Sequence, residues 1–231
     1  MTTRIAVLAS GGGSNLQAIL DHFDALGDQR SGHVVAVASD RATAGALERA
    51  RRCEIPTTVL GSEPVAAKAA LERLLNEHGV ELIALAGYLK LVPNDVVARF
   101  EGRIVNVHPA LLPAFGGRGM YGTRVHHAVI ESGARVSGVT VHFVDADYDR
   151  GAIIAQWPVP VFPGDDAGML ADRVLRVEHI LYPRVLDAVA GGRVVLSRRD
   201  DASPVGTKPS FTLLPHEDSR LAENIELALA R

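Results

Sequence analysis

The chain has 231 residues, of which 47% are hydrophobic and 22% are charged, and its formal net charge is −3. This composition excludes a largely disordered chain, and the slight acidic excess leaves no overall basic field to attract nucleic acid. The single cysteine, Cys53, excludes a disulfide framework and a thiolate metal cluster and is typical of a reducing compartment. We find neither a signal-peptide pattern nor an apolar run near the roughly 20 residues of a membrane span. We therefore expect a cytoplasmic protein with neither a nucleic-acid nor a membrane partner.

The first half of the chain alternates short apolar runs with amphipathic stretches, which is typical of βα units and a parallel sheet. The expected strands are residues 4–9, 33–39, 57–60, 82–86 and 104–108. The expected helices between them are residues 15–26, 44–52, 64–78 and 93–100.

The pattern changes in the second half. Residues 110–122 contain four glycines and a proline, which predicts a long functional loop. A helix over 123–132 is followed by strands over 137–143 and 153–161, and Pro158 and Pro160 mark the last strand as an edge. The short connection between these two strands predicts an antiparallel pair. We expect helices over 166–190 and 219–231.

We therefore predict an α/β fold with a Rossmann-like, open and mostly parallel sheet, helices on both faces and an antiparallel C-terminal edge. We expect residues 1–197 to form one domain and residues 198–231 to form an extension of unknown role.

A glycine-rich turn, Ser10-Gly-Gly-Gly-Ser14-Asn15, joins the first strand to the first helix. Glycines let a backbone approach a ligand closely, and a helix N-terminus offers free N–H groups and a positive dipole end. Leu16 stands where a dinucleotide fingerprint needs its third glycine, and no Walker A lysine follows. A small phosphorylated ligand is the favoured interpretation. The alternative is a tight turn in which Ser14 or Asn15 caps the helix.

Asn106 and His108 share one face at the end of a strand, because side chains alternate along a strand and Pro109 ends it. Ligands of open α/β sheets bind at the carboxyl ends of the strands. An amide and an imidazole there predict a reaction centre, in which one group orients a carbonyl and the other handles a proton or a developing charge. A polar pair that merely closes the strand is the equally weighted alternative.

The turn over residues 145–151 carries three aspartates, and a carboxylate from it would stabilise the His108 imidazolium and raise its pKa if the strands are neighbours. The spacing lacks the terminal Glu of a calcium loop, and from the sequence alone a solvated turn is the favoured explanation for Asp145 and Asp147. His126 and His127 are adjacent and diverge on a helix, so we expect no metal site. Glu178, in an otherwise apolar helix, is either a partly buried contact or a ligand for a substrate amine or hydroxyl.

Six motifs occur in a shared order over about 195 residues: Ser10-Gly-Gly-Gly-Ser-Asn15-Leu-Gln-Ala-Ile19, Leu85-Ala-Gly-Tyr88, Asn106-Val-His108-Pro-Ala-Leu-Leu-Pro113, Gly138-Val-Thr140-Val-His142-Phe-Val, Asp149-Arg-Gly151 and Glu178-His-Ile-Leu-Tyr-Pro183. On these residues the chain resembles the phosphoribosylglycinamide formyltransferases, folate-dependent enzymes of purine synthesis. The Asn-x-His-Pro-x-Leu-Leu-Pro motif is specific only to the wider formyltransferase superfamily. The glycine loop and the Glu-His-x-x-Tyr-Pro segment narrow the resemblance to this family.

The resemblance implies transfer of the formyl group of 10-formyltetrahydrofolate to the amine of glycinamide ribonucleotide, without a metal. It assigns catalysis to Asn106, which orients the formyl group, His108, which stabilises the oxyanion and moves protons, and Asp149, which pairs with His108. The residues that it assigns to the ribonucleotide are Gly13, Ser14, Asn15, Gly87, Pro109 and Glu178. The residues that it assigns to the folate are Leu89, Lys90, Leu91, Val92, Asn106, His142, Asp145, Tyr148 and Asp149. The ribonucleotide half is expected within about residues 1–100 and the folate and catalytic half within about 101–197.

The chain departs from the family at one point. Glu63-Pro64 stands where many members carry an arginine thought to meet the folate tail, and Lys68 or Lys90 would have to substitute for that arginine.

Three other functions compete with formyl transfer to glycinamide ribonucleotide. A 10-formyltetrahydrofolate hydrolase typically carries an added N-terminal regulatory domain, and this chain starts at its first strand. A methionyl-tRNA formyltransferase needs a basic C-terminal domain, and the tail here is acidic to neutral. A non-catalytic phosphosugar-binding protein would be expected to lose Asn106, His108 or Asp149. We expect a monomer or a homodimer.

Overall fold

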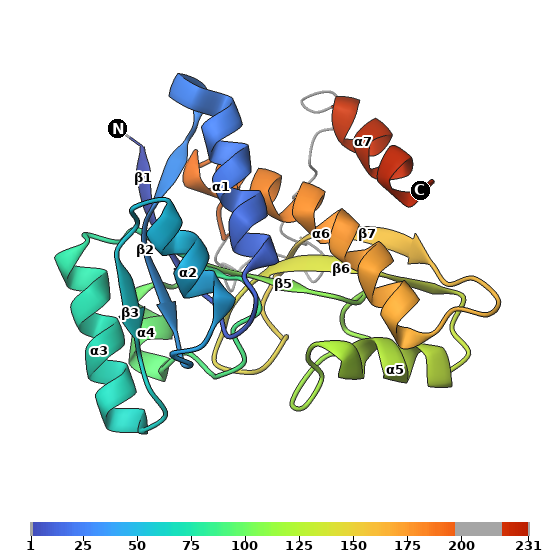
Figure 1. Cartoon of the computed structure of the whole chain (residues 1–231), viewed down its shortest axis with the longest axis horizontal. Helices are drawn as coiled ribbons and strands as arrows, with labels where there is room; N and C mark the ends of the chain where they lie inside the picture. The colour runs from blue at the N-terminus through green and yellow to red at the C-terminus, as the bar shows by residue number, and fades with distance from the viewer. Residues whose placement is uncertain (1, 197–218, 231) are drawn as a thin grey trace, which may run out of the picture.

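A computed structural model describes residues 2–196 and 219–230. Within these ranges a seven-stranded sheet carries helices on both faces (Figure 1). The strands are β1 (Thr3–Leu8), β2 (Gly32–Ser39), β3 (Thr57–Val59), β4 (Leu82–Leu85), β5 (Ile104–His108), β6 (Val136–Phe143) and β7 (Ile153–Pro160). The helices are α1 (Ser14–Leu26), the 3-10 turn η1 (Gly27–Gln29), α2 (Gly45–Arg52), α3 (Pro64–Glu77), α4 (Asn94–Arg99), α5 (Thr123–Glu131), α6 (Ala167–Ala190) and α7 (Ser219–Leu229).

The strand order is β3-β2-β1-β4-β5-β6-β7. Neighbouring strands from β3 to β5 are parallel, whereas β6 runs antiparallel to both β5 and β7. Pro158 and Pro160 lie in β7 at the edge of the sheet, where a missing N–H costs no ladder bond. The predicted fold class, including its antiparallel C-terminal edge, is confirmed.

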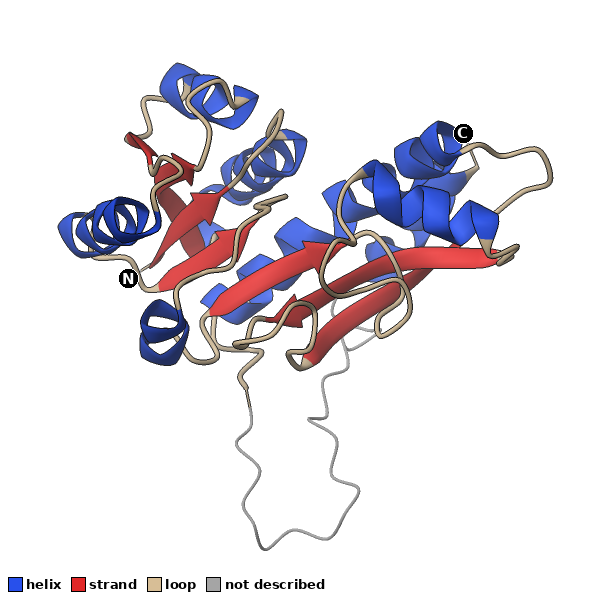
Figure 2. Cartoon of the chain, turned by 90° about the horizontal axis from the view of Figure 1, so that it is seen from below, coloured by secondary structure: helices blue, strands red, loops and turns tan. Residues whose placement is uncertain are grey.

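Two apolar layers hold the sheet, because successive side chains of a strand point to opposite faces. In β1, Ile5 and Val7 pack in the layer that includes α1, α2 and α6, whereas Ala6 and Leu8 pack in the layer under α3 and α4. Figure 2 shows these helices on the two sides of the strands. Burial on both faces explains why these strands read as continuous apolar runs in the sequence.

The long helix α6 is fixed to the middle of the sheet by a buried tyrosine. The Tyr182 hydroxyl, which is fully buried, lies 3.0 Å from the Leu85 carbonyl of β4 and 2.9 Å from the Val105 carbonyl of β5. Glu178 precedes Tyr182 by four residues and therefore lies on the same face of the helix. The anchor thus points Glu178 toward the sheet and α1.

The described part of the C-terminal extension packs against α6. In Figure 1, α7 lies beside α6, and its Leu221 and Ile225 are buried in the layer that includes α6. Residues 197–218, which make up most of the predicted extension, lie outside the described residues. Among the described helices, none combines the length and the apolar character needed to cross a membrane.

A crevice is expected between β1 and β4, because the strand order reverses there and the carboxyl ends of the parallel strands meet at that edge. One residue joins the two turns at this point. The Ser10 N–H donates to the Gly87 carbonyl at 3.0 Å, and the Ser10 hydroxyl accepts the Leu89 N–H at 3.0 Å. The glycine turn after β1 is therefore held next to the turn after β4.

Candidate active site

A cavity of about 370 Å³ opens at the carboxyl ends of β4 and β5. Its walls come from the turn after β4, the end of β5, the loop before α5, the end of β6 and the turn that follows β6. Both Asn106 and His108 line it, as their shared face of β5 predicts. Asn106 and His108 therefore face a cavity and do not merely close the end of the strand.

Strand β6 places a second histidine opposite Asn106. The register pairs Asn106 with His142 across the antiparallel ladder, and Asn106 Nδ2 lies 3.0 Å from His142 Nε2. His142 Nδ1 lies 2.8 Å from the Phe143 carbonyl, which can only accept, so Nδ1 carries the proton. His142 Nε2 therefore accepts from the Asn106 amide. This contact fixes the amide and leaves its oxygen and one N–H for a ligand.

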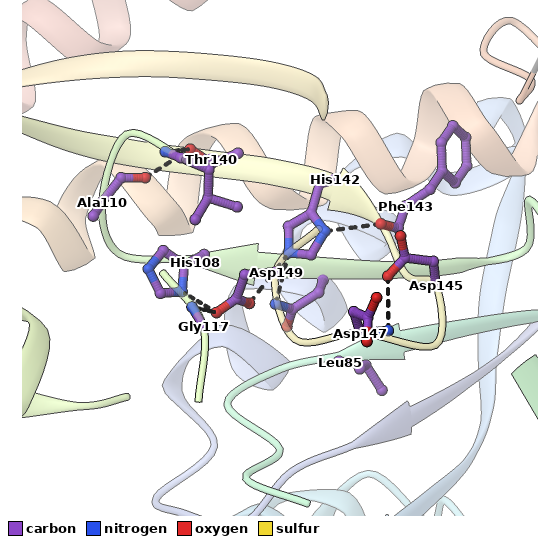
Figure 3. Close-up of polar contacts among 12 residues, drawn as sticks. Leu85, His108, Ala110, Gly117, Thr140, His142, Phe143, Asp145, Asp147 and Asp149 are labelled. Atoms are coloured by element: carbon purple, nitrogen blue, oxygen red, sulfur yellow. Dashed lines mark hydrogen bonds and ion pairs between the residues drawn. The ribbon is translucent and has the colours of Figure 1, made fainter. Parts of the chain in front are cut away.

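Asp149 lies between the two histidines (Figure 3). Its Oδ2 is 3.6 Å from His108 Nδ1, and its Oδ1 is 3.7 Å from His142 Nε2. Two backbone groups of the loop before α5 complete the arrangement. The Gly117 N–H donates to Asp149 Oδ2 at 2.8 Å, and His108 Nε2 lies 2.9 Å from the Phe115 carbonyl. The predicted pairing of Asp149 with His108 is therefore present in the geometry.

The two residues that contact His108 are held in an uncommon backbone conformation. Phe115 has φ of 54° and Asp149 has φ of 55°, the left-handed region that side chains other than glycine seldom adopt. Such conformations persist where the surrounding structure enforces them, and they cluster at functional sites.

Burial changes the expected charge of His108. Desolvation lowers the pKa of His108 and outweighs the carboxylate of Asp149 and the Phe115 carbonyl, which both raise it. The predicted effect of a carboxylate from the acidic turn is present, because Asp149 raises this pKa, but burial has the larger effect and the net shift is downward. For Asp149, burial favours a higher pKa, but a hydrogen bond from the His142 ring in its protonated form, the charge of His108 and the Gly117 N–H together lower it. The pair thus combines an ionised carboxylate with an imidazole that loses its proton readily.

The nine residues predicted to bind folate all line the cavity, namely Leu89, Lys90, Leu91, Val92, Asn106, His142, Asp145, Tyr148 and Asp149. Of the two lysines considered for the folate tail, Lys90 lines the cavity, whereas Lys68 pairs with Asp95 and Glu72. Glu63 accepts the N–H groups of Val65 and Ala66 at the start of α3 and has a structural role there.

The glycine turn and Glu178 form a second region outside the walls of that cavity. Helix α1 begins at Ser14, its N-cap is Gly13, and no side chain caps it, so the alternative that Ser14 or Asn15 serves as the cap is wrong. The Asn15 amide instead donates to Glu178 at 2.6 Å. Burial raises the pKa of Glu178 to about 7, although the Asn15 bond opposes the shift. Of the predicted ribonucleotide residues, Gly87 and Pro109 line the cavity, and the Gly87 carbonyl also accepts the Ser10 N–H of the glycine turn.

Comparison with known proteins decides the family. The family model described as formyl transferase matches residues 3–186. The chain belongs to the formyl transferase family. It is 44% identical over 207 residues to the chloroplastic phosphoribosylglycinamide formyltransferase of Arabidopsis thaliana, covering 87% of this chain and 70% of that one. A solved glycinamide ribonucleotide transformylase 1 from Symbiobacterium toebii matches with a TM-score of 0.78 at 42% identity, over 86% of this chain and 92% of that one.

Another relative of this formyl transferase is much longer. The trifunctional purine biosynthetic protein adenosine-3 of Gallus gallus is 40% identical over 195 residues, which cover 83% of this chain but 19% of that protein. The chain therefore corresponds to one part of the trifunctional protein.

Several site residues of this family member were missed by sequence reasoning. The cavity walls also include Tyr88, Arg118, Met120, Tyr121 and Arg124. The glycines of residues 110–122 signalled a functional loop, but nothing in the pattern showed which of its residues face the site. Within the described residues, no group of three or more His, Cys, Asp or Glu side chains is arranged to hold a metal ion.

Proposed function

We propose that this formyl transferase transfers the formyl group of 10-formyltetrahydrofolate to the amine of glycinamide ribonucleotide. The products are formylglycinamide ribonucleotide and tetrahydrofolate, and the reaction is a step of de novo purine (IMP) biosynthesis. The proposal depends on one observation above all: Asn106, His108 and Asp149 converge on one cavity wall of a chain whose similar relatives are named for this reaction.

The chemistry is acyl transfer between two nitrogens. The acceptor amine attacks the formyl carbon, a new C–N bond forms, and the carbonyl oxygen becomes an oxyanion. The N–H of Asn106 that His142 leaves free donates to that oxygen and orients the formyl group. Collapse of the tetrahedral intermediate breaks the bond to the folate nitrogen, which takes up a proton.

His108 moves the proton between the two nitrogens in this proposal. Its Nε2 is committed to the Phe115 carbonyl, so Nδ1 is the basic atom of the neutral ring. A proton that reaches Nδ1 lies beside Asp149 Oδ2, whose charge stabilises the imidazolium. The lowered pKa of His108 suits a group that accepts a proton from the attacking amine and then returns it.

The two substrates occupy the two regions of the site. The backbone N–H groups at the start of α1 hold the ribonucleotide phosphate, through Gly13, Ser14 and Asn15. Glu178 receives the hydroxyl end, and Gly87 and Pro109 on the cavity wall contact the part of the acceptor near the reaction centre. The folate ring enters the cavity between Leu89–Val92 and the turn of Asp145 and Tyr148, with Lys90 available to the carboxylates of the folate tail.

In this proposal residues 1–197 form the catalytic domain, with most ribonucleotide contacts in residues 1–100 and the catalytic groups in residues 101–197. The division is incomplete, because residues 89–92 and Glu178 contribute across it. We also propose a cytoplasmic enzyme that acts as a monomer or a homodimer, needs no metal, and binds neither nucleic acid nor membrane.

A single assay tests the activity. The protein is mixed with 10-formyltetrahydrofolate in the presence and absence of glycinamide ribonucleotide, and tetrahydrofolate release is followed by absorbance. Release that requires the ribonucleotide supports the proposal. Release without it indicates the hydrolase, and no release under either condition rejects the enzyme and leaves a phosphosugar-binding protein.

A further inference from the structure

Helix α2 holds two successive carbonyls of the glycine turn. The Ala46 N–H donates to the Gly11 carbonyl at 3.1 Å, and Arg49 Nε donates to the Gly12 carbonyl at 2.8 Å. Both carbonyls therefore point toward α2. None of the roles assigned above uses Arg49.

This orientation determines where the neighbouring N–H groups point. In a trans peptide the C=O and the following N–H lie on opposite sides. The N–H groups of Gly12 and Gly13 therefore point away from α2. With those of Ser14 and Asn15 at the start of α1, they have no backbone or side-chain acceptor among the described residues. Several N–H groups directed to one side form an anion-binding concavity.

The glycine turn packs tightly against α2 and is open on its other side. A Cβ on Gly13 would lie 2.6 Å from the Ala46 Cα, and Gly13 has φ of 77°. A Cβ on Gly11 or Gly12 would meet no atom within 4 Å. Gly13 therefore serves the contact with α2, whereas the other two glycines face the space that a ligand would fill.

Arg49 also connects the turn to the first turn of α1. Its NH1 donates to Gln17 Oε1 at 3.2 Å, and its side chain is half-buried beside Ser14. We propose that Arg49 is a positioning residue for the acceptor phosphate: it fixes the Gly12 peptide so that the N–H groups of residues 12–15 converge on one anion. This inference rests on the proposed function for the identity of the phosphate ligand.

The test compares Arg49→Met with Arg52→Met, a matched control that removes the same charge one turn later on α2. Arg52 pairs with Glu48, and its side chain is 74% exposed. The loss of a charge-assisted bond to the turn is expected to raise the KM for glycinamide ribonucleotide by roughly 10- to 100-fold in R49M. The kcat and the KM for the formyl donor are expected to stay within about threefold of wild type. R52M is expected to match wild type in all three values.

Arg49→Lys keeps a donor for the Gly12 carbonyl and is expected to recover most of the acceptor affinity, which a general loss of stability would not allow. Equal effects of R49M and R52M, or a folded R49K as impaired as R49M, would overturn the inference. So would an acceptor KM that is unchanged in R49M.

Calorimetric titration with ribose 5-phosphate, with ribose as its control, separates the inference from the proposed function. Wild type is expected to bind the phosphorylated sugar and R49M to bind it at least tenfold more weakly. That result stands even in a protein that transfers no formyl group. Normal formyl transfer with equal ribose 5-phosphate binding in wild type and R49M would reject the inference and leave the function intact.

Discussion

The two regions of the site present different kinds of chemical group to a ligand. Around the glycine turn, the groups available to a ligand are backbone N–H groups, and the Ala46 N–H and the Arg49 side chain hold the turn from the α2 side. At the end of β5 the available groups are side chains, and backbone groups of Phe115 and Gly117 hold them in place through hydrogen bonds. The first region offers a fixed partial charge that does not titrate, whereas the second offers groups that gain and lose protons. A phosphate needs only to be held, but formyl transfer needs a proton to move.

This contrast predicts that catalysis and acceptor binding can be damaged separately. The largest expected effect is at the end of β5, where side chains gain and lose protons. His108→Ala is expected to lower kcat about 1,000-fold while changing the KM for glycinamide ribonucleotide little, because the glycine turn lies outside the cavity walls. Steady-state kinetics measures both values, and the exposed His127→Ala is the control. A comparable rise in the acceptor KM would show that the two regions are not separable.

Asp149→Asn tests whether Asp149 controls the protonation of His108. Asparagine also tolerates a positive φ, so the turn is expected to persist. Since the Asp149 charge raises the pKa of His108 against burial, its loss lowers that pKa further. We expect kcat to fall about 100-fold and the limb of the kcat/KM profile governed by His108 to move to lower pH. A limb that stays in place, as it should in Asp147→Asn, would contradict the assignment.

Glu178 lies beside the glycine turn but differs from the backbone N–H groups there, because its carboxyl group titrates. Its pKa in the folded state is raised from 4.5 to about 7, so the folded chain keeps a proton that the unfolded chain loses. The stability associated with the protonated form is therefore present at low pH and is lost as the pH rises from about 4.5 to about 7. Glu178→Gln removes this loss, and the free energy of unfolding of the variant relative to wild type should increase by about 3 kcal/mol across that interval. Denaturant midpoints at several pH values measure it, with the exposed Glu77→Gln as control.

The smallest expected effect concerns the backbone itself. Gly13→Ala adds a Cβ 2.6 Å from the Ala46 Cα at a positive φ, which should shift the N–H groups and raise the acceptor KM about tenfold. Gly61→Ala is a matched control, since Gly61 has φ of 78° and a Cβ there meets no atom within 4 Å. Equal kinetic behaviour of the two variants would show that turn geometry does not govern the binding of the acceptor.

The two regions also differ in how far the sequence predicts them. Period-two alternation was enough to place Asn106 and His108 on one face, and the proline-marked edge and short turn correctly indicated that β6 and β7 pair antiparallel. The contact of His142 with Asn106 depends on the exact β5–β6 register, which alternation alone does not fix. The net shift of the His108 pKa depends on burial, which is a property of the whole fold.

Backbone partners are harder still to predict. The Phe115 carbonyl acts through an atom that every residue carries, so no residue type signals it. Arg49 belongs to a helix rich in arginine, and the sequence does not distinguish it from Arg51 and Arg52, which pair with Glu48. A role of this kind becomes visible only when the donor and the carbonyl it contacts are both placed in space.

Ser10 touches the segments proposed for both substrates, through the Gly87 carbonyl and the Leu89 N–H. The bond to the Gly87 carbonyl is made by the backbone, whereas the bond to the Leu89 N–H needs the Ser10 hydroxyl. Ser10 is thus a position where a change of side chain is expected to shift the folate segment relative to the glycine turn, and so to affect both substrates. Variation that adapts the enzyme to a different formyl donor should therefore accumulate in the turn after β6 and the loop before α5, which shape the cavity without contacting this serine.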